Sequence, residues 1–581
     1  MTKRVLVVAL VALLAAIGAV YVLQPERGVP DDAPSEQTMA DEIGAPIMQH
    51  VFNGYVDGRS GDIYLVPKPH SFLLGEWDYA TLGTDTPTLS TSHPNPWSYL
   101  ARVPMIFYGP GYVPAGQTVE REVDITALAP TYARILGLDD FTRPGAPLDE
   151  IGATAKRAPK VIFTLIVDGG GWNALQLHPE SVRNLNALRD QGTTYVNATI
   201  GSAPSITGAL HATFGTGDYP RGHGIPGNQM RSPDDPGKTV DTWLDDEDPR
   251  YLKLSTISDE WDEANGNKPV VGAVAYEGWH LGMLGHGAFE EAGDSDVGVV
   301  WDVDEESWST NTEFYTLPDY LQPTDIARLE SYEESLDPRD GVAEGTWFGH
   351  SLEQLQQPTV RPGTPAFVRF TGDAAVSVFE REGFGRDALT DLMWVELKSP
   401  DYAGHAWNVT GAEQGDVLRE ADAQIGRFKR MLDEKVGRGN YLLAISADHG
   451  QQPLPDLHGG WRINNIELER DIERRFGDDV VMKVTPVDVY FDMDEVEEQD
   501  LSLDDVARFL GTYTIGDNVP EDAPGADRVP EGRLDEKLFA GAFTGDFIES
   551  LSAEDIEGFG ASDYPEGSFV PGASPSPEAG R

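Results

Sequence analysis

The 581-residue chain contains no cysteine, which excludes a disulfide framework and any site that binds metal through thiolates. Basic residues are also scarce, because 43 Lys and Arg stand against 97 Asp and Glu, for a formal net charge of −54. Binding to nucleic-acid phosphates needs clustered Lys and Arg, so this charge argues against a nucleic-acid partner. An acidic protein can still act on an anionic substrate where metal ions reverse the local charge. Any zinc here must be bound by His and Asp side chains.

Long apolar runs are scarce as well, and a single one is long enough to cross a membrane. It comprises residues 5–23 and follows Lys3 and Arg4. As a helix this run spans about 28 Å, close to the hydrocarbon thickness of a bilayer. The flanking positive charges predict that the N-terminus stays inside and that the rest is exported. Residues 1–24 are therefore expected to anchor an extracytoplasmic protein to the cell membrane by a helix, or to be a cleaved signal segment of a secreted one.

The rest of the sequence indicates one large α/β unit between two polar segments. Residues 25–48 are rich in Pro, Asp and Glu and are expected to be a linker, and residues 561–581 are expected to be a disordered tail. Between them, strand-like runs alternate with helical patterns, which predicts an α/β fold with a largely parallel central sheet. Residues 231–265 and 300–345 are acidic and weakly periodic, as expected for surface insertions. The clearest strand candidates are residues 161–167, 269–276, 392–397 and 441–446, and the clearest helix candidates are residues 124–138 and 413–437.

Metal-ligand residues follow three of the predicted strands. In open α/β sheets, ligands bind at the carboxyl ends of the strands. An Asp after a single buried strand is usually a turn residue or a helix cap. Three such ends that carry only Asp and His predict a shared metal site. The candidates are Asp168 after the first of these strands, Asp401 and His405 after the second, and Asp448 and His449 after the third.

Thr207 stands at the start of the pattern "TGALHATFGTG", which is typical of a helix N-terminus. A threonine at this position can serve simply as an N-cap. A helix N-terminus also favours negative charge and presents backbone N–H groups to an anion. A hydroxyl that lies there and is bound to a metal can ionise and attack phosphorus. His211 and His223 lie in the same stretch and are expected to be structural rather than metal ligands.

Four motifs, "VDGGG", "PSITGALHATFGTGDYPRGHGIPGN", "SPDYAGH" and "SADHG", resemble in this order those of the alkaline phosphatase superfamily, in its type I phosphodiesterase/nucleotide pyrophosphatase branch. The resemblance covers most of residues 159–500 and implies an alkaline-phosphatase-like sheet with helices on both faces. It also implies a small-molecule phosphate ester as substrate and two zinc ions, in whose place other divalent metals are possible. The nucleophile would be Thr207, and Asn228 would bind a phosphoryl oxygen. One ion would be bound by Asp168, Thr207, Asp448 and His449, and the other by Asp401, His405 and one further histidine.

The further histidine is not where the family has it. In those relatives the last ligand lies near the C-terminus, between a strand like "SGDIYLV" and a strand like "VPLIFYGPG". Here the corresponding series precedes the nucleophile, and it contains His93 in "STSHPNPWSYLARVPMIFYGPG". We therefore expect a circular permutation, in which residues 49–150 are the C-terminal segment of a catalytic domain formed mainly by residues 151–560. His93 is then the expected last ligand, with His458 as the alternative; a duplication is the rival explanation, but residues 500–560 show no second copy.

A second departure from the family's motif pattern bears on the substrate preference. Phosphomonoesterases of this group carry a Lys and an Arg in a motif like "SIKDRSAI", which binds the extra charge of a terminal phosphate. The aligned stretch "AYEGWHLGM" has Glu277 and Trp279 at those positions. A dianionic monoester loses more than a diester when such cations are absent, so cleavage of phosphodiesters or pyrophosphates through a phospho-threonine is expected. The alternatives are a monoesterase or a phosphonate or sulfate ester hydrolase of the same superfamily, and a catalytically degraded, acidic surface protein that binds metal.

Overall fold

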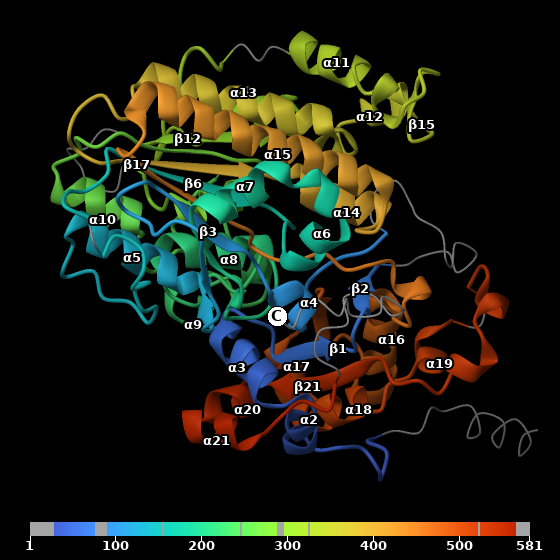
Figure 1. Ribbon diagram of the computed structural model, residues 1–581. Coiled ribbons are helices and arrows are strands. Elements are labelled where there is room, and N and C mark those ends of the chain that lie inside the picture. The colour runs from blue at the N-terminus through green and yellow to red at the C-terminus, as the bar shows by residue number, and fades with distance from the viewer. Residues whose placement is uncertain are drawn as a thin grey trace, which may run out of the picture.

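The computed structural model describes residues 28–75, 90–153, 155–243, 247–287, 295–322, 326–520 and 523–564. These residues form a nine-stranded, largely parallel sheet and a separate four-stranded antiparallel sheet (Figure 1). The α/β class predicted from the sequence is thereby confirmed. In spatial order, the strands of the large sheet are β13 (Ser307–Ser309), β12 (Val297–Asp302), β11 (Val271–Val274), β16 (Asp391–Leu397), β6 (Val161–Val167), β17 (Tyr441–Ser446), β3 (Met105–Tyr108), β7 (Thr193–Tyr195) and β4 (Gln117–Val119).

The central strands are buried on both faces. Every residue of β6, with the sequence VIFTLIV, is buried, and so is every residue of β16 and β17. Strands that are covered on both sides are continuous apolar runs rather than alternating ones, which is why these three were recognisable from the sequence. Along β6, Phe163 and Leu165 belong to one apolar cluster, whereas Ile162 and Ile166 belong to another on the opposite face.

Helices cover both faces of the large sheet, as Figure 1 shows. On one side lie α7 (Arg183–Gln191), α13 (Pro365–Glu382) and α15 (Ala412–Leu432), and on the other lie α5 (Leu128–Leu136), α8 (Thr207–Thr216) and α10 (Ile257–Ala264). The helix expected at 124–138 begins later than predicted. A 3₁₀ turn precedes α5, and Asp124 caps this turn by accepting a hydrogen bond from the Thr126 N–H at 3.0 Å.

The segment expected to be a linker, residues 25–48, is instead largely helical where the structure describes it. It forms α2 (Glu36–Ile43) and the start of α3 (Ala45–Gly54). Met39, Ala40 and Ile43 are buried, because their spacing places them on one face of α2. The acidic and proline-rich composition that suggested a linker belongs to the exposed side and to the residues before the helix.

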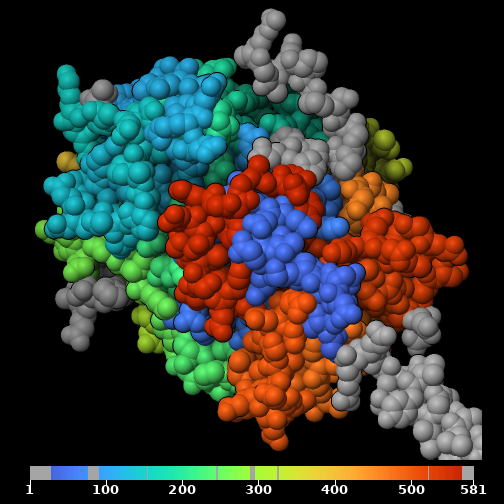
Figure 2. Space-filling model, turned by 90° about the horizontal axis from the view of Figure 1, so that it is seen from below, coloured from blue at the N-terminus to red at the C-terminus, as the bar shows by residue number. Residues whose placement is uncertain are grey.

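The N-terminal and C-terminal parts of the described chain lie side by side (Figure 2). In the four-stranded sheet, β1 (Ile63–Pro67) pairs on one side with β20 (Asp488–Phe491) and on the other with β21 (Phe539–Thr544). The Ala45 N–H donates to Gly560 O at 2.9 Å, and the Asp563 N–H donates to Glu42 O at 2.9 Å. The tail predicted from residue 561 is thus ordered at its start, while residues 565–581 lie outside the described part.

The two segments expected to be surface insertions are partly built into the fold. Ile257 and Trp261 of α10 are buried in the core beneath the sheet, and the second segment includes the end of β12. Among the described residues, no helix is both long and apolar enough to cross a bilayer. The run at residues 5–23, predicted to be an anchor or signal segment, lies outside the described residues.

Candidate metal centre

The candidate site lies where three neighbouring parallel strands end. β6 has β16 on one side and β17 on the other, and Leu397 and Ser446 lie opposite Val167 and Ile166, respectively. The chain segments that leave these strands therefore start beside one another at one edge of the sheet. They carry Asp168 directly after β6, Asp448 and His449 after β17, and Lys398, Asp401 and His405 after β16, the last two within α14 (Ser399–Trp407).

The first ligand set consists of Asp168, Asp448 and His449, all with fully buried side chains. His449 Nε2 lies 3.4 Å from Asp168 Oδ1 and 3.2 Å from Asp448 Oδ2. The other oxygen of Asp448, Oδ1, accepts hydrogen bonds from the Gly169 and His449 N–H groups at 3.1 and 3.0 Å. The other His449 ring nitrogen donates to Gly450 O at 2.9 Å. One atom of Asp448 and one of His449 are thus fixed by the backbone, and the remaining atom of each faces the set.

The three converging atoms of the first ligand set have the properties of a cation site. Asp168 Oδ1, Asp448 Oδ2 and His449 Nε2 make no hydrogen bond within the described part of the chain, although all three are buried. Burial and the neighbouring Asp168 raise the pKa of Asp448 well above its ordinary value. Burial and the nearby His93 lower the pKa of His449 to about 3, so the imidazole is neutral and its lone pair is free. A cation between the two buried carboxylates would allow both to stay ionised.

The second ligand set consists of His93, Asp401 and His405. Asp401 Oδ1 lies 3.2 Å from His93 Nε2 and 3.3 Å from His405 Nε2, and these two nitrogens are 3.2 Å apart. His93 Nδ1 donates to Ser205 O at 2.7 Å, and His405 Nδ1 donates to Thr91 O at 2.6 Å. With each Nδ1 occupied, each Nε2 is left as the atom that can bind a metal ion.

His93 reaches the site because β3, which follows it, pairs antiparallel with β17. Met105 at the start of β3 lies opposite Ser446 at the end of β17, so the preceding loop arrives at the carboxyl edge of the sheet. The His93 ring stacks on that of His449 with centroids 3.6 Å apart, which makes the two ligand sets adjacent. The alternative, His458, lies instead beside His70, with ring centroids 6.4 Å apart.

Thr207 is the first residue of α8, and its side chain is buried. The N-cap is Ile206, and Thr207 makes no side-chain cap hydrogen bond, so its hydroxyl is not used as a cap. Asn228 Oδ1 accepts a hydrogen bond from the Gly208 N–H at 2.8 Å. This contact places Asn228 next to Thr207 and leaves its Nδ2 group as a donor.

Lys398 joins both ligand sets to Thr207, and the sequence reasoning did not identify it. Its Nζ lies 2.9 Å from Asp168 Oδ2, 2.8 Å from Asp401 Oδ2 and 3.4 Å from Thr207 Oγ1. Burial alone would lower the pKa of Lys398, but Asp168 and Asp401 outweigh it and raise the pKa well above its ordinary value. The available signal was a lysine directly after the buried run 392–397, where a charge needs partners.

A further polar group lies behind Asp168. His280 Nε2 is 3.3 Å from Asp168 Oδ2 and 3.7 Å from Glu396 Oε1. His211 joins Asp168 and His280 in a third group of side chains whose ligand atoms lie within 4.8 Å of one another. His211 Nδ1 is also bonded to Thr207 O at 3.0 Å. His211 thus lies at the site, whereas His280 and Glu396 were not singled out from the sequence.

Three other residues were singled out from the sequence, namely His223, Glu277 and Trp279. His223 Nε2 is bonded to Thr213 Oγ1 at 3.1 Å, a structural contact within the α8 region. Glu277 precedes the 3₁₀ helix η4 (Gly278–Met283), and burial of its carboxyl raises its pKa to about 7. Trp279 lies on η4 and is partly buried against the apolar cluster beneath the sheet. Neither residue supplies a cation, as the sequence indicated.

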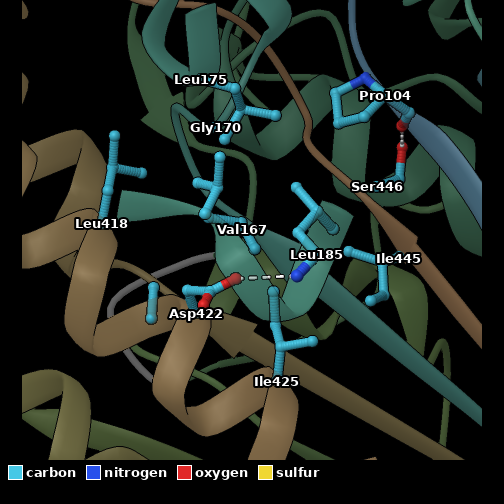
Figure 3. A pocket seen from close by; sticks show the side chains of 12 residues that line it. Pro104, Val167, Gly170, Leu175, Leu185, Leu418, Asp422, Ile425, Ile445 and Ser446 are labelled. Atoms are coloured by element: carbon cyan, nitrogen blue, oxygen red, sulfur yellow. Dashed lines mark hydrogen bonds between the residues drawn. The ribbon is translucent and has the colours of Figure 1, made fainter. Parts of the chain in front are cut away.

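The small apolar cavity in Figure 3 has none of the candidate metal ligands in its lining. It is lined mainly by aliphatic side chains of β6, α7 and α15, among them Val167, Leu185 and Ile425. Its one carboxylate, Asp422, accepts the Leu185 N–H at 2.8 Å and so serves to hold the start of α7. The cavity is a packing feature between helices and sheet.

Comparisons with known proteins bear on the family and the fold. The chain is similar to the alkaline phosphatase PafA of Elizabethkingia meningoseptica, with 25% identity over 411 residues that cover 61% of this chain and 73% of the relative. It is also similar to a protein of Myroides odoratus described as a calcium-transporting ATPase, with 26% identity over 396 residues that cover 60% of this chain and 72% of the relative. Its fold is similar to the crystal structure of wild-type alkaline phosphatase PafA, with a TM-score of 0.50 and 21% identity, covering 66% of this chain and 84% of that one.

The model of one protein family matches residues 162–548, which is more than half of the chain. The matched region contains Thr207 and every predicted ligand except His93. That exception is the residue that the order of motifs had placed in a displaced segment. The chain belongs to the type I phosphodiesterase/nucleotide pyrophosphatase family and is a phosphoric ester hydrolase.

Proposed function

We propose that the chain hydrolyses phosphate esters through a phospho-Thr207 intermediate at a centre that holds two divalent metal ions, with zinc as the first choice. The observation that carries the proposal is the position of the Thr207 hydroxyl. Lys398 Nζ contacts one carboxylate from each ligand set and also lies 3.4 Å from Thr207 Oγ1. Lys398 therefore links the hydroxyl to both sets.

The donor atoms of each set suit zinc. Each set offers carboxylate oxygen and imidazole nitrogen from three side chains, and catalytic zinc sites typically have three protein ligands and one open position. The hydroxyl of Thr207 would occupy the open position of the first ligand set. Two ions bound here would neutralise charge on the attacking and leaving oxygens of an in-line displacement.

The chain's own residues perform the following steps in this proposal. Thr207 Oγ gives up its proton to solvent and forms a bond to phosphorus as the bond from phosphorus to the ester oxygen breaks, and the leaving alkoxide takes a proton from solvent to become the alcohol. A water oxygen then bonds to phosphorus, the bond to Oγ breaks, and a proton returns to Thr207. The N-terminus of α8 and the Nδ2 group of Asn228 donate hydrogen bonds to the phosphoryl oxygens in both steps.

Replacement of the nucleophile tests the proposal. Thr207→Ala should lower turnover by about 10⁴-fold or more, because the two half-reactions both need the hydroxyl. Metal content and circular dichroism should stay near those of the wild type. Thr213→Ala is the matched control, since Thr213 is a buried threonine of the same helix whose hydroxyl bonds to Ala209 O. Radiolabelled substrate should leave acid-stable label on the wild type and on Thr213→Ala. Label or undiminished turnover in Thr207→Ala would end the proposed mechanism.

We also propose that the protein is exported, with residues 1–24 as anchor or signal, because this is the one membrane-length apolar run in the sequence. Cell fractionation and N-terminal sequencing of the mature protein test this. Cytoplasmic recovery of an intact chain would contradict it.

The permuted order of segments is likewise proposed, and it is supported by β1, which pairs with two strands from the C-terminal part. A chain that begins near residue 155 and carries residues 28–153 after residue 564 should fold, bind metal and turn over substrate, because the present ends lie side by side. The control is a chain relinked in the same way but opened within a buried strand, which should not fold. If the chain opened near residue 155 also failed to fold, this would argue against the permutation.

A further inference from the structure

We infer that Lys398 is a substrate-contacting, specificity-determining residue, and that its ammonium adapts the centre to dianionic phosphomonoesters. The inference deepens the proposed function and rests on it. It replaces the preference for diesters expected from Glu277 and Trp279, since that preference depended on there being no side-chain cation beside the nucleophile.

The contacts of Lys398 are compatible with metal ions in both sets. Asp168 and Asp401 each divide their two oxygens in the same way. The Oδ1 atoms face the imidazoles of their own ligand sets, and the Oδ2 atoms face Lys398 Nζ at 2.9 and 2.8 Å. The ammonium therefore contacts the two carboxylate oxygens that do not face the imidazoles, one on Asp168 and one on Asp401. It can hold both carboxylates in place while each presents Oδ1 to its metal.

The same ammonium reaches the position of the transferred group. Its Nζ lies 3.4 Å from Thr207 Oγ1, the atom that would be bonded to phosphorus. An oxygen on that phosphorus is then within hydrogen-bonding reach of the ammonium. Only 6% of the lysine side chain is exposed, so water screens this charge weakly and its attraction for phosphoryl oxygen is correspondingly strong.

The charge of the substrate decides which ester benefits. A phosphomonoester carries one more negative oxygen than a diester, in which an organic substituent takes that oxygen's place. Among the described residues, Lys398 is the one basic side chain that forms a hydrogen bond with Thr207 Oγ1. An added ammonium stabilises the dianion more than the monoanion, in the ground state and in the transition state. Lys398, directly after β16, thus supplies the cation that the monoesterase motif would have carried within residues 275–283.

The competing arrangement is a third metal ion behind Asp168. Its ligands would be Asp168 Oδ2, His280 and Glu396, and both carboxylate oxygens of Glu396 are buried without a hydrogen-bond partner among the described residues. Such an ion would require Asp168 Oδ2, which Lys398 Nζ already contacts at 2.9 Å. The geometry favours the ammonium, and the metal content of the holoenzyme distinguishes the two arrangements.

The test compares Lys398→Met, which keeps the length of the side chain and removes its charge, with Lys398→Arg, which keeps the charge. Lys398→Met should lower kcat/KM for p-nitrophenyl phosphate by about 100-fold or more, the scale of removing one preorganised charge donor. For bis(p-nitrophenyl) phosphate the loss should be about tenfold or less, because the diester offers less charge to the ammonium.

Inhibition by inorganic phosphate should weaken in parallel with monoester turnover, and Lys398→Arg should recover part of the monoester preference. Lys429→Met serves as control, since Lys429 pairs with Asp433 on the α15 side of the molecule.

Three outcomes would overturn the inference. Equal losses for the two esters, with two metal ions still bound, would make Lys398 a residue that only positions the carboxylates. Loss of metal in Lys398→Met would give it a structural role. Three metal ions in the wild-type holoenzyme would place an ion where Lys398 is assigned. If the wild type hydrolyses neither ester, the proposed function fails, whereas inorganic phosphate binding by calorimetry, wild type against Lys398→Met, still tests Lys398 separately.

Discussion

The two ligand sets are built by different means, although they contain the same kinds of side chain. The first ligand set comes from the ends of two neighbouring parallel strands, β6 and β17, and its three side chains are fully buried. The second ligand set joins one turn of α14 to His93, and His93 and His405 are 312 residues apart in the chain. Its side chains are 8%, 2% and 16% exposed for His93, Asp401 and His405. The set that follows two adjacent strands is fully buried at the carboxyl edge of the sheet, whereas the set completed by a loop lies nearer to solvent.

The largest effect is expected from breaking the first ligand set. Asp448→Asn should preserve the contacts of Oδ1 with the backbone and remove the charge of Oδ2. We expect the bound metal to fall from two ions to one and kcat/KM to drop by about 10⁴-fold or more, because the proposed nucleophile, Thr207, would share this set and such groups act as a unit. Metal analysis and steady-state kinetics measure both quantities. Two retained ions with normal kinetics would remove Asp448 from the site.

A smaller loss of kcat/KM is expected when a residue of the second ligand set is replaced. His93→Ala should remove the second ion while the first stays bound, and kcat/KM should fall by about 10²- to 10³-fold, the scale of one electrostatic group at the reacting oxygens. His458→Ala is the matched control, because His458 lies beside His70 instead of the centre. If His458→Ala lost the ion and His93→Ala kept it, the assignment of the last ligand would be reversed.

The support of the second ligand set can be tested with two adjacent glutamines that are both buried. Gln451 Nε2 donates to Asp401 Oδ1 at 2.5 Å, whereas Gln452 Nε2 donates to His70 O at 3.1 Å. Gln451→Leu should weaken binding of the second ion by about 10- to 100-fold, the usual effect of losing a hydrogen bond to a metal ligand. Gln452→Leu should lower stability without changing metal affinity. Equal metal affinities in the two variants, measured by competition with a chelating dye, would show that Gln451 does not orient Asp401.

The smallest effect concerns the rates of metal release. A chelator should remove the two ions in separate phases, with the second ligand set emptied first because His405 is partly exposed and the first ligand set is sealed. Stopped-flow chelation with wild type and His93→Ala assigns the phases, since the variant should lack the faster one. A single phase in the wild type, or loss of the slower phase in His93→Ala, would mean that exposure does not control release.

Much of this centre could be predicted because its parts are local in the sequence. Asp168, Asp448 and His449 follow apolar runs that are recognisable as buried strands, and Asp401 and His405 are one helical turn apart. His93 required a different argument, from the order of the motifs. Glu396 lies in the predicted strand 392–397 and Lys398 directly follows it, but the contacts of both side chains are with residues from other strands and could not be read from the sequence. The helices at residues 36–54 were missed because the polar, proline-rich composition around them outweighed the helical spacing of a few apolar residues.

The sequence by itself determined the α/β class, the central strands, the family motifs and the types of ligand, because each depends on residues close together along the chain. The tertiary structure alone decided that His93 lies against Asp401, that its ring stacks on His449, and that an ammonium lies between two carboxylates and Thr207. Strand order and the antiparallel pairing of β3 with β17 place these groups together. Metal binding and charge complementarity depend on distances in space, and for residues hundreds of positions apart only the fold sets those distances.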